Sequence, residues 1–398
     1  MKSGWLRCVL AAGWLVLLAG CGSSSKSALV YLVSQGSDPG TITPYRLNLG
    51  KGTLSSDNGA LKSSGKATDT GTQPGPIIFD PSNSFIFVAD FGSPLVAGTG
   101  GDIAAFSVGK DGALTSIGLT APTAIAGETL SPAALAMDPD GKFLFVASQA
   151  FANGTPAAGV VSVFSVSSGT LTAQANVAIP VPAGSTNLPL PSAIAVTNSG
   201  TGKFVYVTDA SNATVVGFSF DDSGALTSVP GQFFMVGNTP RAVLSPPSGT
   251  FLYVANAGSD DIYEFSVNSD GSLVPVGGST TNTTIAAGVG PIAMITDPDT
   301  KYLYALANGG SQINEYTINR VTGALAAVGV NGGAVSTGAN PVAFTMRSDG
   351  STSGNFWVIT SNFGSNTVST FALNGSTGTL SPLPQLTAPL APYGIGSR

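Results

Sequence analysis

One pattern of residues recurs along almost the whole chain, and no other feature constrains the fold as strongly. Each copy begins with Pro and a short apolar run, passes through a turn to an apolar and aromatic run, and ends with a β-branched run, an aromatic residue and a Gly-x-Leu turn. The β-branched run is the most regular, because Ile or Val lies three residues before an aromatic residue in seven copies: Ile42/Tyr45, Ile103/Phe106, Val161/Phe164, Val215/Phe218, Ile262/Phe265, Ile313/Tyr316 and Val368/Phe371. Four short strands in a period of about 50 residues are typical of a propeller blade. We therefore predict an all-β, seven-bladed β-propeller with four antiparallel strands per blade.

The two ends of the sequence hold complementary parts of one blade. Residues 29–33 already have the pattern of a second strand, with no first strand before them. Residues 392–396 match the first strand and have no second strand after them. Pairing of these segments would close the ring and remove two open sheet edges, which otherwise invite aggregation. An open solenoid would leave both half-units unexplained.

The repeat also assigns places to its small and its aromatic residues. The position two residues after the first-strand Pro holds compact residues: Pro76, Ala134, Ala193, Ala242, Ala293, Ala343 and Gly394. Seven inner strands that converge on one axis leave little room for larger side chains. The aromatics of the third strands are expected to fill the wedge that widens between neighbouring blades, where each buried ring contributes roughly 1.5–3 kcal/mol.

The first residues are typical of an export signal. Lys2 and Arg7 precede an apolar stretch over residues 9–19, which is too short for a membrane-spanning helix of about 20 residues. Leu18-Ala19-Gly20-Cys21 then resembles a bacterial lipobox, and a Ser-rich run over 22–27 is typical of a flexible tether. The alternative is an ordinary signal peptide with a chance cysteine. We predict a signal peptide over 1–20, a lipidated Cys21 and tether over 21–27, and one propeller domain over 28–398.

Cys21→Ser should yield an unlipidated precursor that no longer partitions with membranes, because the lipid would be attached to this thiol. Detergent partitioning and precursor processing of the variant measure this directly. Membrane partitioning and processing identical to those of the unaltered chain would contradict lipidation at Cys21.

Charge and cysteine usage exclude several kinds of partner. Removing residues 1–20 takes away Lys2 and Arg7, so the net charge changes from −6 to −8, and only 9% of residues are charged. A sparse, acidic charge pattern does not suit nucleic acids, which need clustered Lys and Arg. The chain has 2 cysteines, one of them in the signal, so a mature disulfide is not expected. We expect a monomer in the cell envelope that contacts the membrane through its lipid anchor alone.

The residue types that are missing limit the chemistry as much as those present. The chain contains no histidine, which excludes a Ser-His-Asp triad and the usual zinc sites. Gly98-Thr99-Gly100-Gly101 precedes no helix and is a poor phosphate loop. We expect no cofactor. An enzyme built on this sequence would use carboxylates, Arg241, Tyr393, or Ca²⁺ or Mg²⁺ held by oxygen ligands.

Polar residues end the second strands on one face of the predicted ring, where the long second-to-third and fourth-to-first loops, such as residues 148–159, are also expected. They are Asp90, Ser148, Asp209, Asn256, Asn308 and Asn362. Together with Arg241 and Tyr393 they could form a polar ring for a ligand or cation at the channel mouth, or they could cap their own strands. Glu264 and Glu315 occupy equivalent third-strand positions, as a carboxylate pair or, as we expect, as two exposed strand residues.

The repeat resembles the β-propeller lactonase family and the related YVTN-repeat surface propellers. Tyr206-Val207-Thr208-Asp209 differs by one residue from the YVTN signature, and residues 251–256 and 138–142 are similar to the usual blade sequence. The resemblance implies the propeller fold, and some members hydrolyse 6-phosphogluconolactone. This chain departs from the family at the channel mouth, where members often carry His or Arg. Here the residues that follow the first-strand Pro are Gly75, Ala133, Ser192, Arg241, Ile292, Val342 and Tyr393.

Two functions follow from these observations. The first hypothesis is a binding or scaffold module of the cell envelope that recognises a protein or a glycan through its loop face. The second is a lactone hydrolase, assisted by a metal or by carboxylates, that acts on a small lactone at the channel mouth. Arg241 has two possible roles: it forms an ion pair with Asp209, or its guanidinium binds an anionic or carbonyl-bearing ligand.

Overall fold

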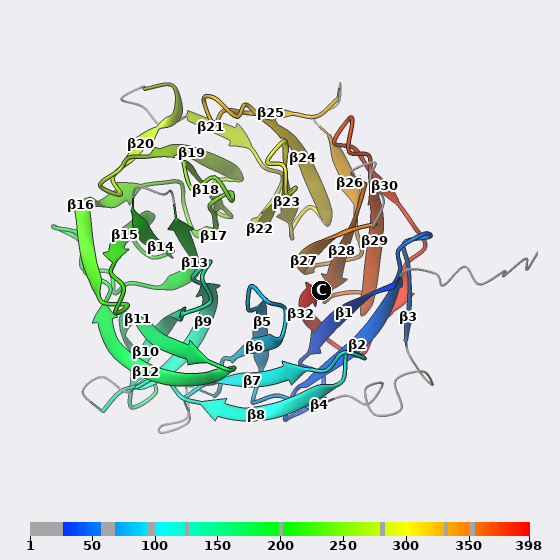
Figure 1. Ribbon diagram of the computed structural model, residues 1–398. Coiled ribbons are helices and arrows are strands. Elements are labelled where there is room, and N and C mark those ends of the chain that lie inside the picture. The colour runs from blue at the N-terminus through cyan, green and yellow to red at the C-terminus, as the bar shows by residue number, and fades with distance from the viewer. Residues whose placement is uncertain are drawn as a thin grey trace, which may run out of the picture.

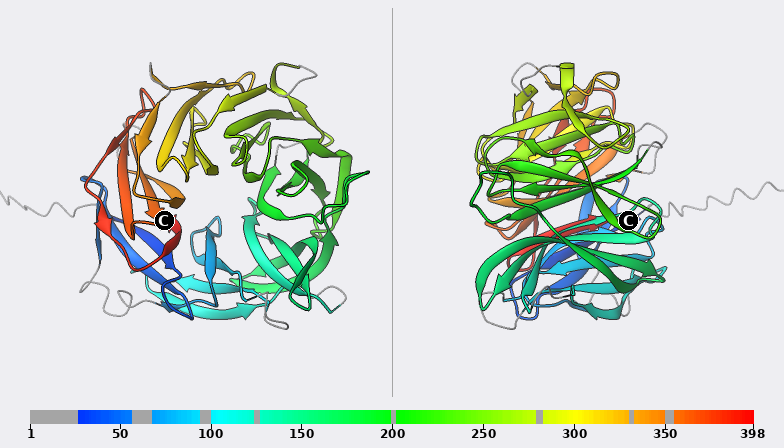
Figure 2. Two further views of the ribbon diagram at one scale, coloured as in Figure 1. Left: turned by 180° about the vertical axis from the view of Figure 1, so that it is seen from behind. Right: turned by 90° about the vertical axis from the view of Figure 1, so that its left-hand side faces the viewer.

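Seven small antiparallel sheets surround a central channel. The computed structural model describes residues 27–56, 68–93, 100–123, 127–198, 202–278, 283–329, 333–349 and 355–398. Figure 1 shows the blades in chain order around the ring, and Figure 2 shows the ring from behind and from the side. The predicted all-β, seven-bladed propeller is confirmed. The predicted lipobox and Cys21 lie outside the described residues.

The strands of blades 1 to 4, from the inner to the outer edge of each blade, are as follows: blade 1, β32 (Pro392–Ser397), β1 (Ser27–Ser34), β2 (Thr41–Asn48), β3 (Thr53–Ser56) and β4 (Thr68–Asp69); blade 2, β5 (Pro74–Phe79), β6 (Phe85–Asp90), β7 (Asp102–Val108) and β8 (Leu114–Thr120); blade 3, β9 (Thr129–Met137), β10 (Phe143–Ala152), β11 (Thr155–Ser167) and β12 (Thr170–Ala178); blade 4, β13 (Pro191–Asn198), β14 (Lys203–Asp209), β15 (Thr214–Phe220) and β16 (Leu226–Met235).

The strands of blades 5 to 7 follow the same order: blade 5, β17 (Pro240–Leu244), β18 (Phe251–Asn256), β19 (Asp261–Val267), β20 (Leu273–Pro275) and β21 (Thr283–Ala286); blade 6, β22 (Pro291–Thr296), β23 (Tyr302–Ala307), β24 (Gln312–Ile318), β25 (Leu325–Ala327) and β26 (Ala334–Ser336); blade 7, β27 (Pro341–Ser348), β28 (Phe356–Asn362), β29 (Thr367–Leu373), β30 (Leu380–Pro382) and β31 (Leu386–Thr387). A single-turn 3-10 helix, η1 (Val276–Gly278), follows β20. In blades 1, 5, 6 and 7 two short segments together make the outer edge, because both pair with the third strand.

The chain ends close the ring as predicted. Strand β32 pairs antiparallel with β1, with Leu32 opposite Ile395. Two backbone bonds between Leu29 and Arg398, of 3.2 and 3.0 Å, continue the ladder to the last residue. The inner strand of blade 1 therefore comes from the C-terminus and the three outer positions come from the N-terminal part of the chain, as Figure 1 shows.

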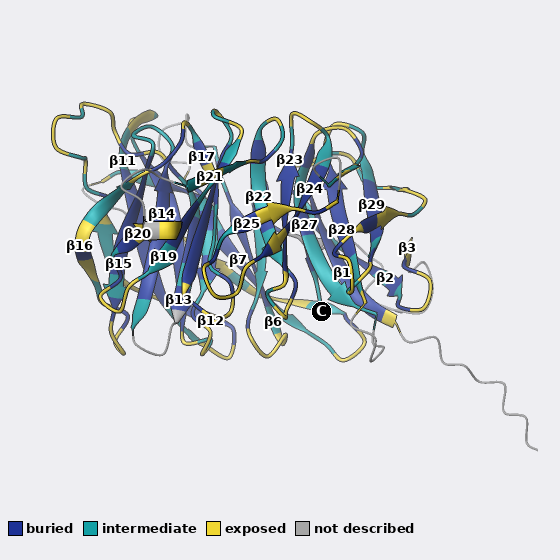
Figure 3. Ribbon diagram, turned by 90° about the horizontal axis from the view of Figure 1, so that it is seen from above, coloured by how far each residue is buried: buried dark blue, intermediate teal, exposed yellow. Residues whose placement is uncertain are grey.

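The core is divided into clusters that lie between neighbouring blades. The seven third-strand aromatics are all buried, from Phe164 at 0% exposed to Tyr45 at 5%. Their clusters join adjacent blades; for example, Tyr253 of blade 5 packs in one cluster with Tyr316 of blade 6. Figure 3 shows the buried strands between the more exposed loops of the two faces. The predicted wedge packing is confirmed, and it makes each blade depend on its neighbours.

Polar contacts also join the blades in a repeated way. The second-strand hydroxyl of Tyr206 donates to the carbonyl of Gly271 in the next blade at 2.7 Å, and Tyr31, Tyr253 and Tyr304 make the equivalent bond. The expectation that Glu264 and Glu315 are exposed is wrong, because they are 2% and 4% exposed. The Glu315 carboxylate accepts the Leu380 N–H of the next blade at 2.8 Å, and Glu264 accepts the equivalent N–H of Leu325.

One predicted long loop is a strand extension. Residues 148–159 continue β10 and β11, which a tight turn at Asn153-Gly154 joins. Both turn residues have positive φ, 50° and 78°, as a two-residue hairpin turn requires. The Asn-Gly pair in the sequence is the signal for this hairpin.

None of the described helices is long and apolar enough to span a membrane.

Candidate functional site

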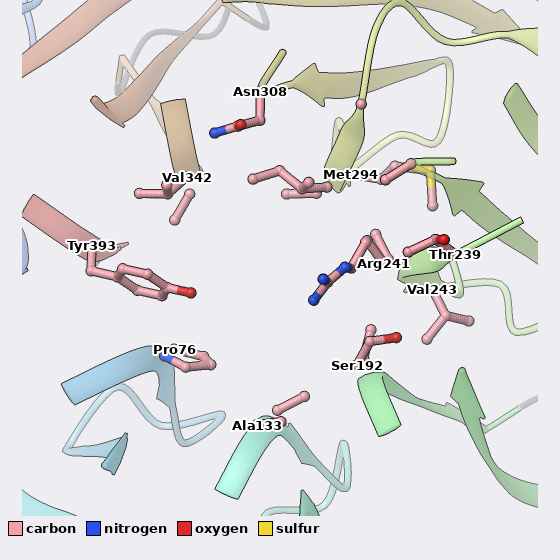
Figure 4. Close-up of a pocket in the computed structure, with 18 of the residues that line it drawn as sticks. Pro76, Ala133, Ser192, Thr239, Arg241, Val243, Met294, Asn308, Val342 and Tyr393 are labelled. Atoms are coloured by element: carbon pink, nitrogen blue, oxygen red, sulfur yellow. The ribbon is translucent and has the colours of Figure 1, made fainter. Parts of the chain in front are cut away.

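A cavity of about 890 Å³ occupies the channel mouth on the loop face. All seven inner strands contribute to its wall, through the small residues two positions after each first-strand Pro. The described lining residues have 5 polar side chains: Ser192, Thr239, Arg241, Asn308 and Tyr393. Figure 4 shows Arg241 and Tyr393 entering the cavity from different blades. The small residues predicted where the inner strands converge thus leave a large cavity at the channel mouth.

A bulge in each inner strand determines which side chains enter this cavity. In blade 5, Pro240 lies opposite Asn256 and Ala242 lies opposite Ala255, so Arg241 is an extra residue without a partner. The same shift follows the first-strand Pro in the other blades. Because a bulge turns an extra side chain out of the regular alternation, the residue after the Pro lines the mouth in six blades, and the exception is Gly75 in blade 2.

Arg241 is the cation of the cavity. Its side chain is exposed, and within the described part of the chain its guanidinium makes neither a hydrogen bond nor an ion pair. The alternative pairing with Asp209 is not present, because Asp209 is fully buried within blade 4. The five N–H groups of Arg241 therefore face the cavity and are available to a carboxylate or a carbonyl oxygen.

Tyr393 faces Arg241 and is held by two aromatic neighbours. Its ring lies edge-on to Phe91 at 5.7 Å and to Phe363 at 6.3 Å between centroids. Burial raises the pKa of the Tyr393 phenol, and the charge of Arg241 partly opposes this rise. The phenol therefore stays protonated at neutral pH, and its hydroxyl points into the cavity as a hydrogen-bond donor (Figure 4).

Asn308 also lines the cavity, but its place in the repeat differs from the predicted one. Pro291 pairs with Ala307, so Ala307 is the residue equivalent to Asn256, and Asn308 lies one position further on. Since side chains alternate along a strand, this shift of one residue turns Asn308 to the channel side. Its amide donates to the Pro341 carbonyl at 2.9 Å, and among the described residues its oxygen accepts no bond, so it can accept one from a ligand.

The structure does not place the other five strand-end residues in the cavity, and Ser148 is fully buried. Asp90 is 1% exposed, and Asp209, Asn256 and Asn362 are fully buried inside their own blades. Asp209 accepts bonds from the N–H groups of Leu190 and Ser211, Asn256 donates to Asp261 at 2.8 Å, and Asn362 donates to Ser369 at 2.9 Å. For Asp209, Asn256 and Asn362 the capping alternative describes the contacts, because each side chain bonds within its own blade. Asp90 instead lies opposite the acid Asp102.

The cavity carries positive charge without a facing carboxylate. No Asp or Glu occurs among its described lining residues. Across the described ranges, no three His, Cys, Asp or Glu side chains lie close enough together to hold a metal ion. The arrangement suits an oxygen ligand with negative or partial negative charge better than a cation.

Sequence reasoning did not single out Thr239, Phe91 or Met294 as site residues. Phe91 directly follows the Asp90 strand end, and Thr239 directly precedes the Pro of Arg241. Both lie one residue beyond a strand end of the repeat. Asn308 does so too, since it follows Ala307 at the end of β23. Met294 lines the deeper wall.

Comparisons with known proteins agree with this geometry. A search of curated proteins finds no match. Among solved structures, a putative 6-phosphogluconolactonase from Bacteroides fragilis matches with a TM-score of 0.71 and 18% identity, covering 94% of this chain and 99% of that one. A periplasmic gluconolactonase from Pseudomonas aeruginosa matches with a TM-score of 0.71 and 19% identity over the same shares of the two chains. At this identity the likeness establishes the fold alone. The family described as "Lactonase, 7-bladed beta-propeller" matches residues 39–390, so the chain belongs to this lactonase family.

Proposed function

We propose that this protein is a lactone hydrolase whose site is the cavity at the channel mouth. The observation that carries the proposal is the convergence of Arg241 and Tyr393, two hydrogen-bond donors, on one cavity without a carboxylate in its described lining. Membership of the lactonase family supports a lactone as the substrate. The binding-module hypothesis has no comparable support.

The chemistry requires stabilisation of an oxyanion. A water oxygen adds to the lactone carbonyl carbon, and the carbonyl oxygen takes the negative charge of the tetrahedral intermediate. The carbon–oxygen bond of the ring then breaks, the ring oxygen becomes a hydroxyl, and a hydroxycarboxylate and one proton leave. Donors that face the forming oxyanion in a partly enclosed site lower this barrier, and the loss of one such donor typically costs roughly 10²–10³ in kcat.

Arg241 suits the oxyanion and the carboxylate product, because a guanidinium donates charged N–H bonds to a single oxyanion and two parallel N–H bonds to a carboxylate. Tyr393 suits a second, neutral donor, because burial keeps its phenol protonated. Neither residue removes a proton from water, so water or hydroxide is the nucleophile in this proposal. We also propose that the protein acts in the cell envelope, on the strength of the Leu18–Cys21 segment.

Arg241→Ala should lower kcat/KM for lactone hydrolysis about 100-fold, and Tyr393→Phe about tenfold, because each removes an oxyanion donor. The thermal midpoint should change little, since Arg241 is exposed and makes no hydrogen bond or ion pair with the described residues. A pH-stat assay with γ-butyrolactone and glucono-δ-lactone measures the rates. Arg320→Ala is the matched control, because this exposed arginine lies on the turn before β25, away from the cavity.

Unchanged hydrolysis in Arg241→Ala would contradict the assignment of the site. A large loss of thermal stability in Arg241→Ala with intact hydrolysis would make Arg241 a structural residue. No hydrolysis of either lactone by the unaltered protein, above the rate in buffer, would contradict the proposed function itself.

A further inference from the structure

A second, smaller cavity of about 150 Å³ opens beside the main one, and we call it the annex. The two cavities share five lining residues: Pro76, Ala293, Met294, Ala343 and Gly394. The annex lies against the inner strands of blades 6, 7, 1 and 2, and Ile77, Phe344 and Ile395 line it on the side away from the main cavity. A ligand in the main cavity therefore has direct access to it.

The side chains of the annex are uniformly apolar. Each described residue that lines it is Pro, Ile, Ala, Met, Phe or Gly. The main cavity offers few additional polar side chains, because the Ser192 hydroxyl already bonds to Thr208 at 2.8 Å and to the Pro240 carbonyl at 2.6 Å. Backbone groups of the inner strands remain available to a ligand, since these strands are the inner edges of their sheets.

This distribution separates two classes of lactone. A sugar lactone carries a hydroxyl on nearly every carbon, and each hydroxyl loses free energy when it is placed against apolar side chains without a partner. An alkyl group gains free energy in the same place. A cavity of 150 Å³ with Leu, Ile and Phe walls stays dry and admits a benzene-sized molecule. The annex has this size, its side chains are as apolar, and it is open to the main cavity, so a chain can enter from there.

We propose that the substrate is a lactone with an alkyl substituent of up to about six carbons, whose ring lies near Arg241 and Tyr393 and whose chain fills the annex. The inference rests on the proposed function for the reaction, but not for the binding of the chain. A polyhydroxylated sugar lactone uses only the main cavity.

The test measures binding and turnover separately. Lactams resist hydrolysis and keep the ring and carbonyl, so 5-alkyl-2-pyrrolidinones with chains of increasing length report binding by titration calorimetry. We expect Kd to fall about three- to fourfold per added CH₂ and to level off near six carbons, a step that corresponds to ~0.8 kcal/mol per buried CH₂. With γ-lactones of the same chain lengths, kcat/KM should rise in parallel and exceed that for glucono-δ-lactone.

Ala293→Leu should fill the annex and leave Arg241 and Tyr393 in place. We expect it to abolish the chain-length gain, so that within this variant the six-carbon lactam binds no more tightly than the unsubstituted one. Ala193→Leu is the matched control, because Ala193 has the same place in blade 4 and lines only the main cavity. Ala343→Leu repeats the test from blade 7, in case Ala293→Leu lowers the thermal midpoint.

The outcomes distinguish the two proposals. Chain-dependent lactam binding without hydrolysis of any lactone would leave the annex assignment standing and overturn the proposed function. Hydrolysis without a chain-length gain, or tighter binding and faster turnover of glucono-δ-lactone, would overturn the annex assignment. Loss of chain-dependent binding in Ala193→Leu and not in the two annex variants would place the chain elsewhere and overturn it as well.

Discussion

Deleting residues 391–398 should abolish cooperative folding or lower the free energy of unfolding by more than about 5 kcal/mol, far beyond the effect of losing a frayed tail. Strand β32 is the inner strand of blade 1. Its Ile395 is only 5% exposed and packs in the cluster that joins blade 1 to blade 7. Its loss leaves the inner edge of β1 unpaired and opens the channel wall between blades 7 and 2. Unpaired strand edges pair with other chains, so the truncated protein should also aggregate.

Thermal unfolding and light scattering measure this result, and two controls make it specific. Ile395→Ala, which keeps the strand but leaves a cavity, should cost about 2–4 kcal/mol and retain a monomeric protein. A synthetic peptide with the sequence of residues 391–398 should restore the midpoint of the truncated protein when added in excess, because it can supply the missing strand. A truncated monomer with the unaltered midpoint would contradict closure of the ring through β32.

The fold was predictable because the repeat encodes what each strand must bury. Seven Ile or Val residues, each three positions before an aromatic, specify the third strands, and these aromatics are the buried residues between blades. The half-units at the two ends then specify the closure. Residues 148–159 are predicted as a long loop because they separate the second and third strands, but the local Asn153-Gly154 turn signal decides the structure of this segment.

The site was predictable only in part. Arg241 and Tyr393 stand out because they depart from the small or apolar residues at the same position in most other blades. The strand-end residues were misplaced because sequence shows that a polar side chain ends a strand, but not to which side it points. Asn308 and Asn256 look equivalent in sequence and differ by one position in register, which turns one into the cavity and buries the other.

The position of Asp90 leads to a prediction about pH. Asp90 ends β6 directly opposite Asp102, which begins β7, and neither Asp90 oxygen makes a well-formed bond to a described donor. Burial raises the pKa of Asp90 to about 8, the neighbouring Asp102 carboxyl adds to the rise, and the Gly71 N–H partly opposes it. Burial raises the pKa of Asp102 as well. The two carboxyls therefore share a proton in the folded protein near neutral pH.

In blades 5 and 7 the same two positions hold an amide donor opposite an oxygen acceptor, so no shared proton is required. Blade 5 has Asn256 opposite Asp261, with a bond of 2.8 Å from the amide to the carboxylate, and blade 7 has Asn362 opposite Thr367, with a bond of 3.0 Å. Blade 2 has two acids at these positions. Asp90→Asn would give blade 2 the arrangement of blade 5.

Asp90→Asn should therefore stabilise the protein by about 2–4 kcal/mol at pH 8.5 and by little at pH 4. The sign follows from a folded pKa above the ordinary 3.8. The folded protein binds a proton that the unfolded chain releases, so stability is full below about pH 4, falls as the pH rises towards 8, and then levels off. Urea unfolding at pH 4, 6.5 and 8.5 measures the difference between the two proteins. Glu264, whose pKa burial raises to about 7, contributes equally to both.

The matched control is Asp209→Asn in blade 4. Its fully buried carboxylate accepts bonds from three N–H groups and the Asn212 amide, so an amide there would place donor against donor and destabilise the fold at every pH. An Asp90→Asn protein with the same pH profile as the unaltered chain would mean that the Asp90–Asp102 pair holds no proton, and that a pair of charged carboxylates is tolerated inside blade 2.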